Sequence, residues 1–199
     1  NNMQRNAWML LAAASLLTLA LYWPALHGPF IFDDFPNLDA LSKYPKAHGW
    51  QRIAQYLSES RGFPGRPLAM LSFYPQRFSW PHNSFPFKLA NTLLHVACGW
   101  LLATWLCLVG RANKPHDKAL LTAVMTATLW LLHPIQLSTV MLSIQRMTIL
   151  ATAFMLLGLT LYTFALTATQ RSQAQRLAAM LTAILLCAPL ALLCKETGA

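Results

Sequence analysis

Apolar residues form long runs along this chain, and polar residues are concentrated in the segments between them. A helix needs about 20 such residues to cross roughly 30 Å of hydrocarbon at about 1.5 Å per residue. The runs predict about five transmembrane helices, at residues 7–26, 89–109, 119–133, 147–168 and 177–193. We therefore predict an all-α polytopic membrane protein with one long external loop at residues 27–87.

Two of these runs have alternative interpretations. The first could be a secretory signal peptide. Its apolar stretch is longer than usual for one, and no small-residue cleavage pattern lies near its end, so we favour an uncleaved anchor. The third run ends at His133-Pro134, because proline ends or kinks a helix. Residues 135–144 either extend it or lie along the membrane interface.

Basic residues in the short connections predict the orientation. Residues 111–118 and 170–176 carry Lys and Arg close to helix ends, as does Arg5 near the start of the chain. The positive-inside rule places all three in the cytoplasm, so the loop at residues 27–87 lies outside. The compact loops favour a bacterial inner membrane, with the external loop facing the periplasm.

The external loop is rich in Pro, aromatic residues and Arg, and it is too apolar to be a solvated linker. Ile53, Tyr56 and Leu57 share one face of a predicted helix, and residues 68–80 mix apolar with aromatic side chains. Both stretches suit helices that lie in the interface, with Trp and Tyr at the level of the headgroups. We expect this loop to lie over the membrane and to cover a cavity.

Composition agrees with a membrane protein, since 56% of the residues are hydrophobic and 11% are charged, against about a quarter charged in soluble domains. The net charge of +9 is spread over both sides of the membrane without a basic helix. This favours anionic lipid or a phosphate-bearing substrate as partner over nucleic acid. The cysteines fit no zinc or disulfide spacing and are interpreted as packing residues. They are Cys98, Cys107, Cys187 and Cys194.

The acidic pair Asp33-Asp34 is the first candidate for chemistry, since only six acidic residues occur in the chain. Both follow the first apolar run and are flanked by Phe30, Phe32 and Phe35. Carboxylates at a membrane surface are costly to desolvate, and such groups often mark function. Alternatively, the pair caps the next helix or meets water at a turn.

Further ionisable residues are expected on the same side of the membrane. They are Arg66, Arg146, Lys195 and Glu196. Each, taken singly, is explained by snorkelling of a long side chain to the headgroups. Taken together, two acids and several cations suit a transfer reaction with a phosphate leaving group.

Three polar residues near the outer helix ends have two interpretations each. Asn91 and His95 are four residues apart and share a helix face, where they would form interhelical hydrogen bonds or contact a substrate. His133 either caps the third helix or makes a polar contact with substrate. The chain lacks a Gly-rich phosphate loop, a His-Glu-x-x-His motif and a Gly-x-Ser-x-Gly motif, which disfavours nucleotide hydrolysis, zinc proteolysis and serine esterase chemistry.

The order of several short motifs resembles a known family. The motifs are Phe30-Ile-Phe-Asp-Asp-Phe-Pro-Asn-Leu38, Gly65-Arg-Pro-Leu68, Asn91-Thr-Leu-Leu-His95, Leu132-His-Pro134, Arg146 and Lys195-Glu-Thr-Gly198. Along essentially the whole chain they resemble the N-terminal half of GT-C glycosyltransferases, in particular bacterial relatives of TMTC-type protein O-mannosyltransferases. The resemblance implies that residues 1–199 are the N-terminal part of a GT-C-like transmembrane domain, with a missing C-terminal half or a partner chain.

The resemblance also implies a reaction, in which a sugar moves from a polyprenyl-phosphate donor to a protein or glycan hydroxyl outside the cytoplasm. Asp33 or Asp34 would be the base, and Arg146, Arg66 and Lys195 would bind the donor phosphate. Asn91, His95, His133 and Glu196 would contact substrate.

No nucleotide or organic cofactor is required by this reaction, because the donor is already activated. Mg²⁺ or Mn²⁺ at Asp33 and Asp34 is compatible with it. The alternative is a non-catalytic membrane subunit that scaffolds or binds a lipid-linked intermediate. A transporter has less support, because the charges are expected at the outer surface and not at the bilayer midplane.

Overall fold

The computed structural model describes residues 2–43, 49–61, 65–111, 115–168 and 170–196, and within these ranges it contains helices and no strands. The α-helices are α1 (Asn2–Tyr22), α2 (Asp34–Leu38), α3 (Trp50–Glu59), α4 (Pro67–Phe73), α5 (Phe85–Gly110), α6 (His116–Leu132), α7 (Gln136–Met141), α8 (Arg146–Thr167) and α9 (Gln173–Leu192). Four short 3-10 helices connect them, namely η1 (Trp23–His27), η2 (Asp39–Lys43), η3 (Tyr74–Ser79) and η4 (Ser143–Gln145). The all-helical prediction is confirmed.

The long helices coincide with the five predicted apolar runs. In the described residues, four stretches are long and apolar enough to cross a membrane: α1 with η1, α5, η4 with α8, and α9. The third run forms α6, which has 17 residues and is therefore shorter than these four. It ends before His133-Pro134, and α7 follows as a separate short helix and not as an extension of α6. A crossing by α6 stays a prediction.

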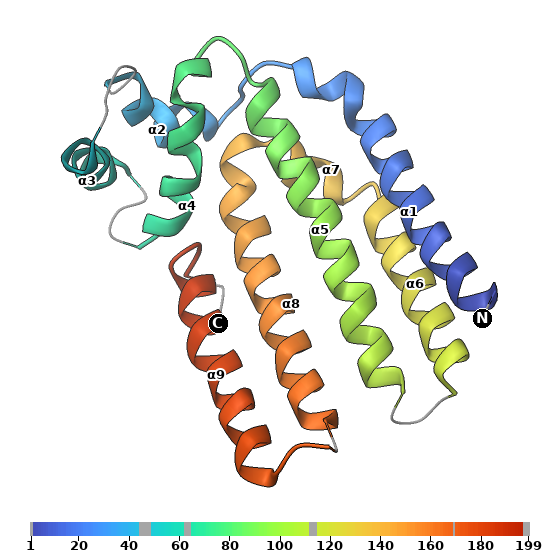
Figure 1. The fold of residues 1–199 in the computed structure, drawn as a ribbon. Helices are drawn as coiled ribbons and strands as arrows, with labels where there is room; N and C mark the ends of the chain where they lie inside the picture. Colours follow the sequence, from blue (N-terminus) through green and yellow to red (C-terminus); the bar gives the residue numbers. More distant parts are fainter. Residues whose placement is uncertain (1, 44–48, 62–64, 112–114, 169, 197–199) are drawn as a thin grey trace.

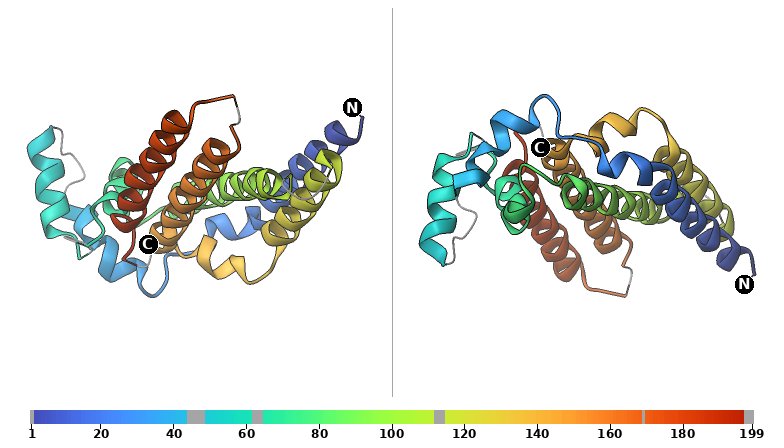
Figure 2. Two further views of the ribbon diagram at one scale, coloured as in Figure 1. Left: turned by 90° about the horizontal axis from the view of Figure 1, so that it is seen from below. Right: turned by 90° about the horizontal axis from the view of Figure 1, so that it is seen from above.

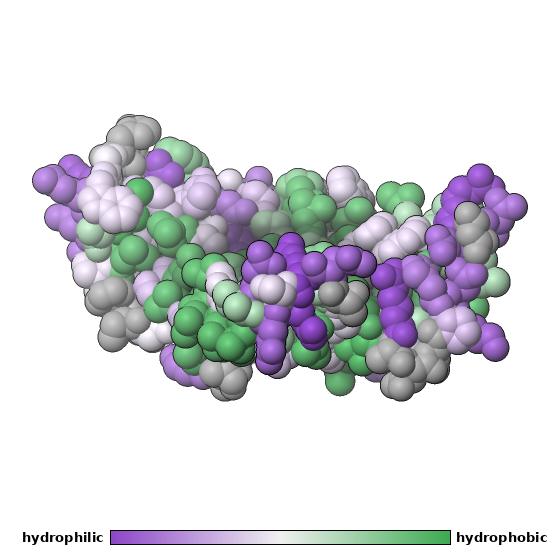
Figure 3. All heavy atoms as spheres, turned by 60° about the horizontal axis from the view of Figure 1, so that its bottom comes forward, coloured by the Kyte–Doolittle hydropathy of each residue, from purple (hydrophilic) through white to green (hydrophobic). Residues whose placement is uncertain are grey.

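The long helices lie side by side in one curved layer (Figures 1 and 2), in the order α9, α8, α5, α6, α1. The end of α5, the start of α6, the end of α8 and the start of α9 lie at the same end of the layer as the start of α1, and α2, α3 and α4 lie at the other end. Figure 3 brings the first of these ends forward and shows hydrophilic residues gathered there, with apolar residues on the helix sides. Arg5 and the described basic residues of the segments 111–118 and 170–176, which the positive-inside rule places on one side of the membrane, therefore lie at one end of the bundle.

Glycine allows the helices of two neighbouring pairs to approach closely. A Cβ added at Gly99 of α5 would lie 2.6 Å from two side-chain carbons of Leu131 on α6. A Cβ added at Gly158 of α8 would lie 2.8 Å from the Cβ of Cys187 on α9. Small residues at such contacts are typical of helix packing in membranes, where close van der Waals contact replaces the hydrophobic effect as the driving force.

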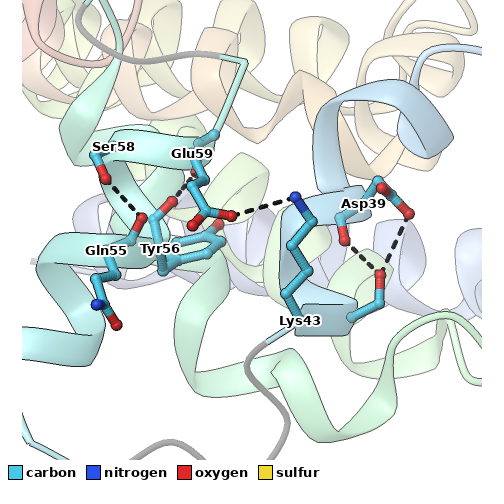
Figure 4. Close-up of polar contacts among 8 residues, drawn as sticks. Asp39, Lys43, Gln55, Tyr56, Ser58 and Glu59 are labelled. Atoms are coloured by element: carbon cyan, nitrogen blue, oxygen red, sulfur yellow. Dashed lines mark hydrogen bonds and ion pairs between the residues drawn. The ribbon is translucent and has the colours of Figure 1, made fainter.

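The described residues of the segment 28–84, here called the external segment after its predicted location, bury a hydrophobic cluster that they share with the long helices. Tyr56 of α3 is fully buried and its hydroxyl donates to the carbonyl oxygen of Met70 at 3.0 Å. Ile53 and Leu57 lie on the same face of α3 and pack on this core, as their spacing predicts. An exposed ion pair between Lys43 and Glu59, 3.2 Å long, connects η2 to α3 (Figure 4) and contributes little to stability.

The core of the external segment continues into the bundle without a gap. Phe73 of α4 and Phe87 of α5 are fully buried, with ring centroids 6.2 Å apart. The backbone N–H of Leu68 donates to the carbonyl oxygen of Leu193 at 3.1 Å, which joins the start of α4 to the end of α9. The segment is therefore a cap packed on the start of α5, the start of α8 and the end of α9.

We predict that Gly99→Val lowers the free energy of unfolding by about 1–3 kcal/mol, because the added carbons meet Leu131 and force α5 from α6. Thermal unfolding of the detergent-solubilised protein measures the loss. The double variant Gly99→Val/Leu131→Ala should regain part of it, because the smaller side chain opens the contact. A double variant less stable than the additive sum of the two single changes would contradict this account of the interface.

Candidate functional site

Several candidate residues lie where the external segment meets the start of α5, the start of α8 and the end of α9. Asp34, the first residue of α2, is fully buried there. Its Oδ1 accepts from the backbone N–H of Ile144 at 2.8 Å and its Oδ2 accepts from that of Ile31 at 3.3 Å. Burial raises the pKa of the Asp34 carboxyl, and these hydrogen bonds and the charge of Lys88 act in the opposite direction. Asp34 thus fastens the external segment to η4.

Asp33 lies next to Asp34 but faces the surface. It is exposed, and its carbonyl oxygen accepts from the side-chain amide of Asn37 at 2.7 Å. Its neighbour Phe32 is 82% exposed and has a φ of 45°, so the turn presents both side chains outward. The two carboxylates differ in environment: Asp34 is committed to backbone donors, whereas Asp33 is open to a ligand.

Arg146 begins α8 and is 2% exposed. Its Nε donates to Asn91 Oδ1 at 2.9 Å, and its Nη1 donates to the Ser72 carbonyl oxygen at 2.9 Å. Its Nη2 donates to Gln76 Oε1 at 2.8 Å and to the Phe87 carbonyl oxygen at 2.9 Å. In this arrangement the guanidinium joins α8 to α5 and to the external segment. Its proposed contact with a donor phosphate stays a prediction, which would require some of these acceptors to be displaced.

Asn91 and His95 both form hydrogen bonds between helices, the first of their two interpretations. Asn91 Nδ2 donates to the carbonyl oxygens of Val140 at 3.2 Å, Leu142 at 3.0 Å and Ser143 at 3.2 Å. His95 Nε2 lies 3.2 Å from the Leu131 carbonyl oxygen of α6. A contact of either residue with substrate stays a prediction.

A second group of charges lies between the start of α4 and the end of α9. Arg66 Nε donates to both carboxylate oxygens of Glu196, at 3.1 and 2.9 Å, and Lys195 Nζ donates to Thr148 Oγ1 at 2.9 Å. A hydrogen bond from its own backbone N–H, together with Arg66, lowers the pKa of Glu196. Three of the predicted site residues, Arg66, Lys195 and Glu196, thus lie in one region, although Arg66 and Glu196 are 130 positions apart in the sequence.

His133 lies apart from these groups. It is exposed, and its Nδ1 accepts from the backbone N–H of Ile135 at 3.2 Å, which stabilises the turn between α6 and α7. This agrees with its capping interpretation. Within the described ranges no cluster of three or more His, Cys, Asp or Glu side chains is placed to hold a metal ion. All four cysteines are buried among apolar residues, as expected of packing residues.

Sequence reasoning missed Lys88 and Gln76. Lys88 of α5 is buried, and its Nζ donates to the carbonyl oxygens of Gly28 at 2.8 Å and Pro29 at 3.0 Å. Gln76 of η3 accepts from Arg146 and donates through Nε2 to the Pro86 carbonyl oxygen at 2.9 Å. A signal was present for Lys88, since a lysine between Phe87 and Leu89 at the start of an apolar run needs polar partners.

Over the residues that the structure describes, the protein is helical, with four helices long and apolar enough for a membrane and with a polar cluster at one end. Comparisons with protein-family models, with curated proteins and with solved structures gave no match to this chain.

The two aspartates should respond differently to truncation. We predict that Asp34→Ala lowers the free energy of unfolding by about 2–4 kcal/mol, because it leaves the buried N–H groups of Ile144 and Ile31 without acceptors. Asp33→Ala should change it by less than about 0.5 kcal/mol, since Asp33 is exposed. Thermal unfolding in detergent compares them, and equal losses would refute the assignment of Asp34 as the anchor.

We predict that Arg146→Lys lowers the free energy of unfolding by about 2–4 kcal/mol, because an ammonium group cannot reach the four acceptors that the planar guanidinium serves. Arg52→Lys on the exposed face of α3 is the matched control and should leave stability unchanged. Urea unfolding of both purified variants measures the difference. A stable Arg146→Lys protein would show that the guanidinium does not hold the cap.

Proposed function

We propose that this chain is the N-terminal part of a membrane glycosyltransferase of the GT-C type, which moves a sugar from a polyprenyl-phosphate donor to a protein or glycan hydroxyl. The observation that carries the proposal is the arrangement at one end of the bundle. An exposed carboxylate, Asp33, is held by a buried anchor, and two cations lie nearby in the fold: Arg66 at the start of α4, paired with Glu196, and Lys195 just after the end of α9. The motif order described above supports the same reaction.

The reaction assigns a separate task to each kind of group. The Asp33 carboxylate takes the proton of the acceptor hydroxyl while the hydroxyl oxygen forms its bond to the anomeric carbon. The bond between the anomeric carbon and the phosphate oxygen breaks, and its electron pair leaves with the polyprenyl phosphate. Lys195 and Arg66 neutralise the negative charge that develops on that phosphate, which lowers the barrier more than it strengthens donor binding.

Asp34 and Arg146 act as positioning residues in this proposal. Asp34 holds the turn that presents Asp33, and Arg146 holds α8 against the external segment. Asp34 offers little to a cation, because both of its oxygens accept from backbone N–H groups. A Mg²⁺ or Mn²⁺ ion at the pair would therefore depend mainly on Asp33 and on substrate oxygens. The orientation that fits the reaction places this end outside the cytoplasm, in a bacterium at the periplasmic face of the inner membrane.

The test is sugar transfer by the intact protein in membranes, with polyprenyl-phosphate sugars extracted from those membranes as donors. We expect Asp33→Asn to lower the rate at least 100-fold at equal abundance, because the amide cannot take the proton. Asp39→Asn, at an exposed aspartate of η2, should leave the rate unchanged.

Two results would overturn the proposal. A parental rate in Asp33→Asn would remove Asp33 as the base. Absence of transfer by the folded parent, despite binding of the labelled donor, would favour a non-catalytic subunit that binds a lipid-linked intermediate.

A further inference from the structure

Phe32 is the most exposed large apolar side chain among the described residues, and its backbone is strained. The residue is 82% exposed. Its φ of 45° lies in the left-handed region, and within the described ranges no other residue except glycine has a positive φ. Side chains with a Cβ rarely adopt this conformation, and such strain is retained mainly at functional positions. The turn thus holds an apolar ring away from the rest of the protein at a cost in free energy.

Two contacts place Phe32 at the level of the helix ends. Before it in the sequence, the carbonyl oxygen of Pro29 accepts from Lys88 Nζ, in the first turn of α5, at 3.0 Å. After it, Asp34 Oδ1 accepts from the backbone N–H of Ile144, near the start of α8, at 2.8 Å. Lys88 and Ile144 both belong to stretches long and apolar enough to cross a membrane. Since the backbone can extend only roughly 7 Å between Phe32 and Asp34, Phe32 lies close to the level at which these helices end.

Other exposed apolar side chains lie at the same end of the layer. Ile135, next to α7, is 70% exposed, and Leu137 of α7 is also exposed. Helices α2 and α7 both contact η4, and both views in Figure 2 show α7 and the segment before α2 on the same side of the layer. Phe32, Ile135 and Leu137, here called the apolar patch, therefore share one side of the bundle at this end.

Lipid is the partner that fits the apolar patch. The long helices form a single layer, so its faces expose apolar side chains along the length of the helices, and the patch continues this surface at one end. Trp23, exposed at the end of the first apolar stretch, is of the residue type that is enriched at the level of the headgroups. An apolar ring beside the exposed carboxylate of Asp33 suits the boundary between hydrocarbon and headgroups, where each group finds its own solvent.

We propose that Phe32, Ile135 and Leu137 insert into the bilayer at the boundary between headgroups and hydrocarbon. The partner of the patch is the lipid surface and not a second protein. Insertion holds the turn that carries Asp33 on the membrane, with the carboxylate at the level of the headgroups. The inference does not depend on the proposed reaction, because it concerns only where this turn lies.

The first test is spin labelling of the intact protein in vesicles of phosphatidylethanolamine and phosphatidylglycerol. The native cysteines are buried, so Phe32→Cys, Ile135→Cys and Gln55→Cys each add one accessible thiol, and the parent treated with the same label gives the background. Gln55 is the control, because it is exposed on the polar face of α3. Relative to a water-soluble nickel chelate, we expect O₂, which concentrates in lipid, to collide at least about fivefold more often with nitroxides at positions 32 and 135 than at position 55.

The second test separates lipid contact from backbone strain and leaves the native cysteines unlabelled. Phe32→Leu keeps an apolar side chain, whereas Phe32→Asn removes it and adopts a positive φ more readily. We expect Phe32→Asn to speed amide hydrogen exchange of residues 28–38 in the same vesicles at least about threefold, because the turn loses its lipid contact, and Phe32→Leu to leave exchange unchanged. Relief of strain alone would slow exchange in Phe32→Asn.

Three results would overturn the proposal. Equal access of the nickel chelate to positions 32 and 55 would show that Phe32 faces water. Little access of either reagent to position 32 would show that another protein segment covers it. Exchange in Phe32→Asn that is no faster than in the parent would show that the ring does not hold the turn on the membrane.

Discussion

The burial of one arginine is the constraint on which this structure depends. A guanidinium beneath the surface of a membrane protein must have its donors satisfied by the protein, and Arg146 finds acceptors on η3, α4 and α5. The rings of Phe73 and Phe87 lie 4.4 and 5.8 Å from the guanidinium carbon and complete its surroundings. Any displacement of the external segment from the bundle would expose this charge or leave it without partners, so the two parts are held in one relative position.

The two adjacent carboxylates, Asp33 and Asp34, have different surroundings. Asp34 faces inward, where burial disfavours its charged form and hydrogen bonds from backbone N–H groups favour it. Asp33 faces outward on the same turn, with Phe32 beside it. The buried hydrogen bonds of Asp34 limit the freedom of the turn and so hold the exposed side chain of Asp33 in place.

The sequence was sufficient to predict the long helices, because hydropathy over about 20 residues is a local property. The sequence left open whether residues 135–144 extend the third helix beyond Pro134. The structure shows that α6 ends before Pro134 and that α7 is a separate short helix. The partners of Arg146 could not be predicted from the sequence, because two of them are the backbone carbonyl oxygens of Ser72 and Phe87, and every residue has a carbonyl oxygen.

The contact between Asp34 and Ile144 has a consequence for how the protein is made. Its two partners are separated by 110 residues, so the carboxylate emerges from the ribosome long before its backbone donor exists. At about 5–20 residues per second, synthesis of the intervening chain takes roughly 5–20 s. During that interval residues 28–43 have been synthesised, but η4 and α8, on which they pack, have not. The cap can therefore assemble only after residues 143–167 have been made.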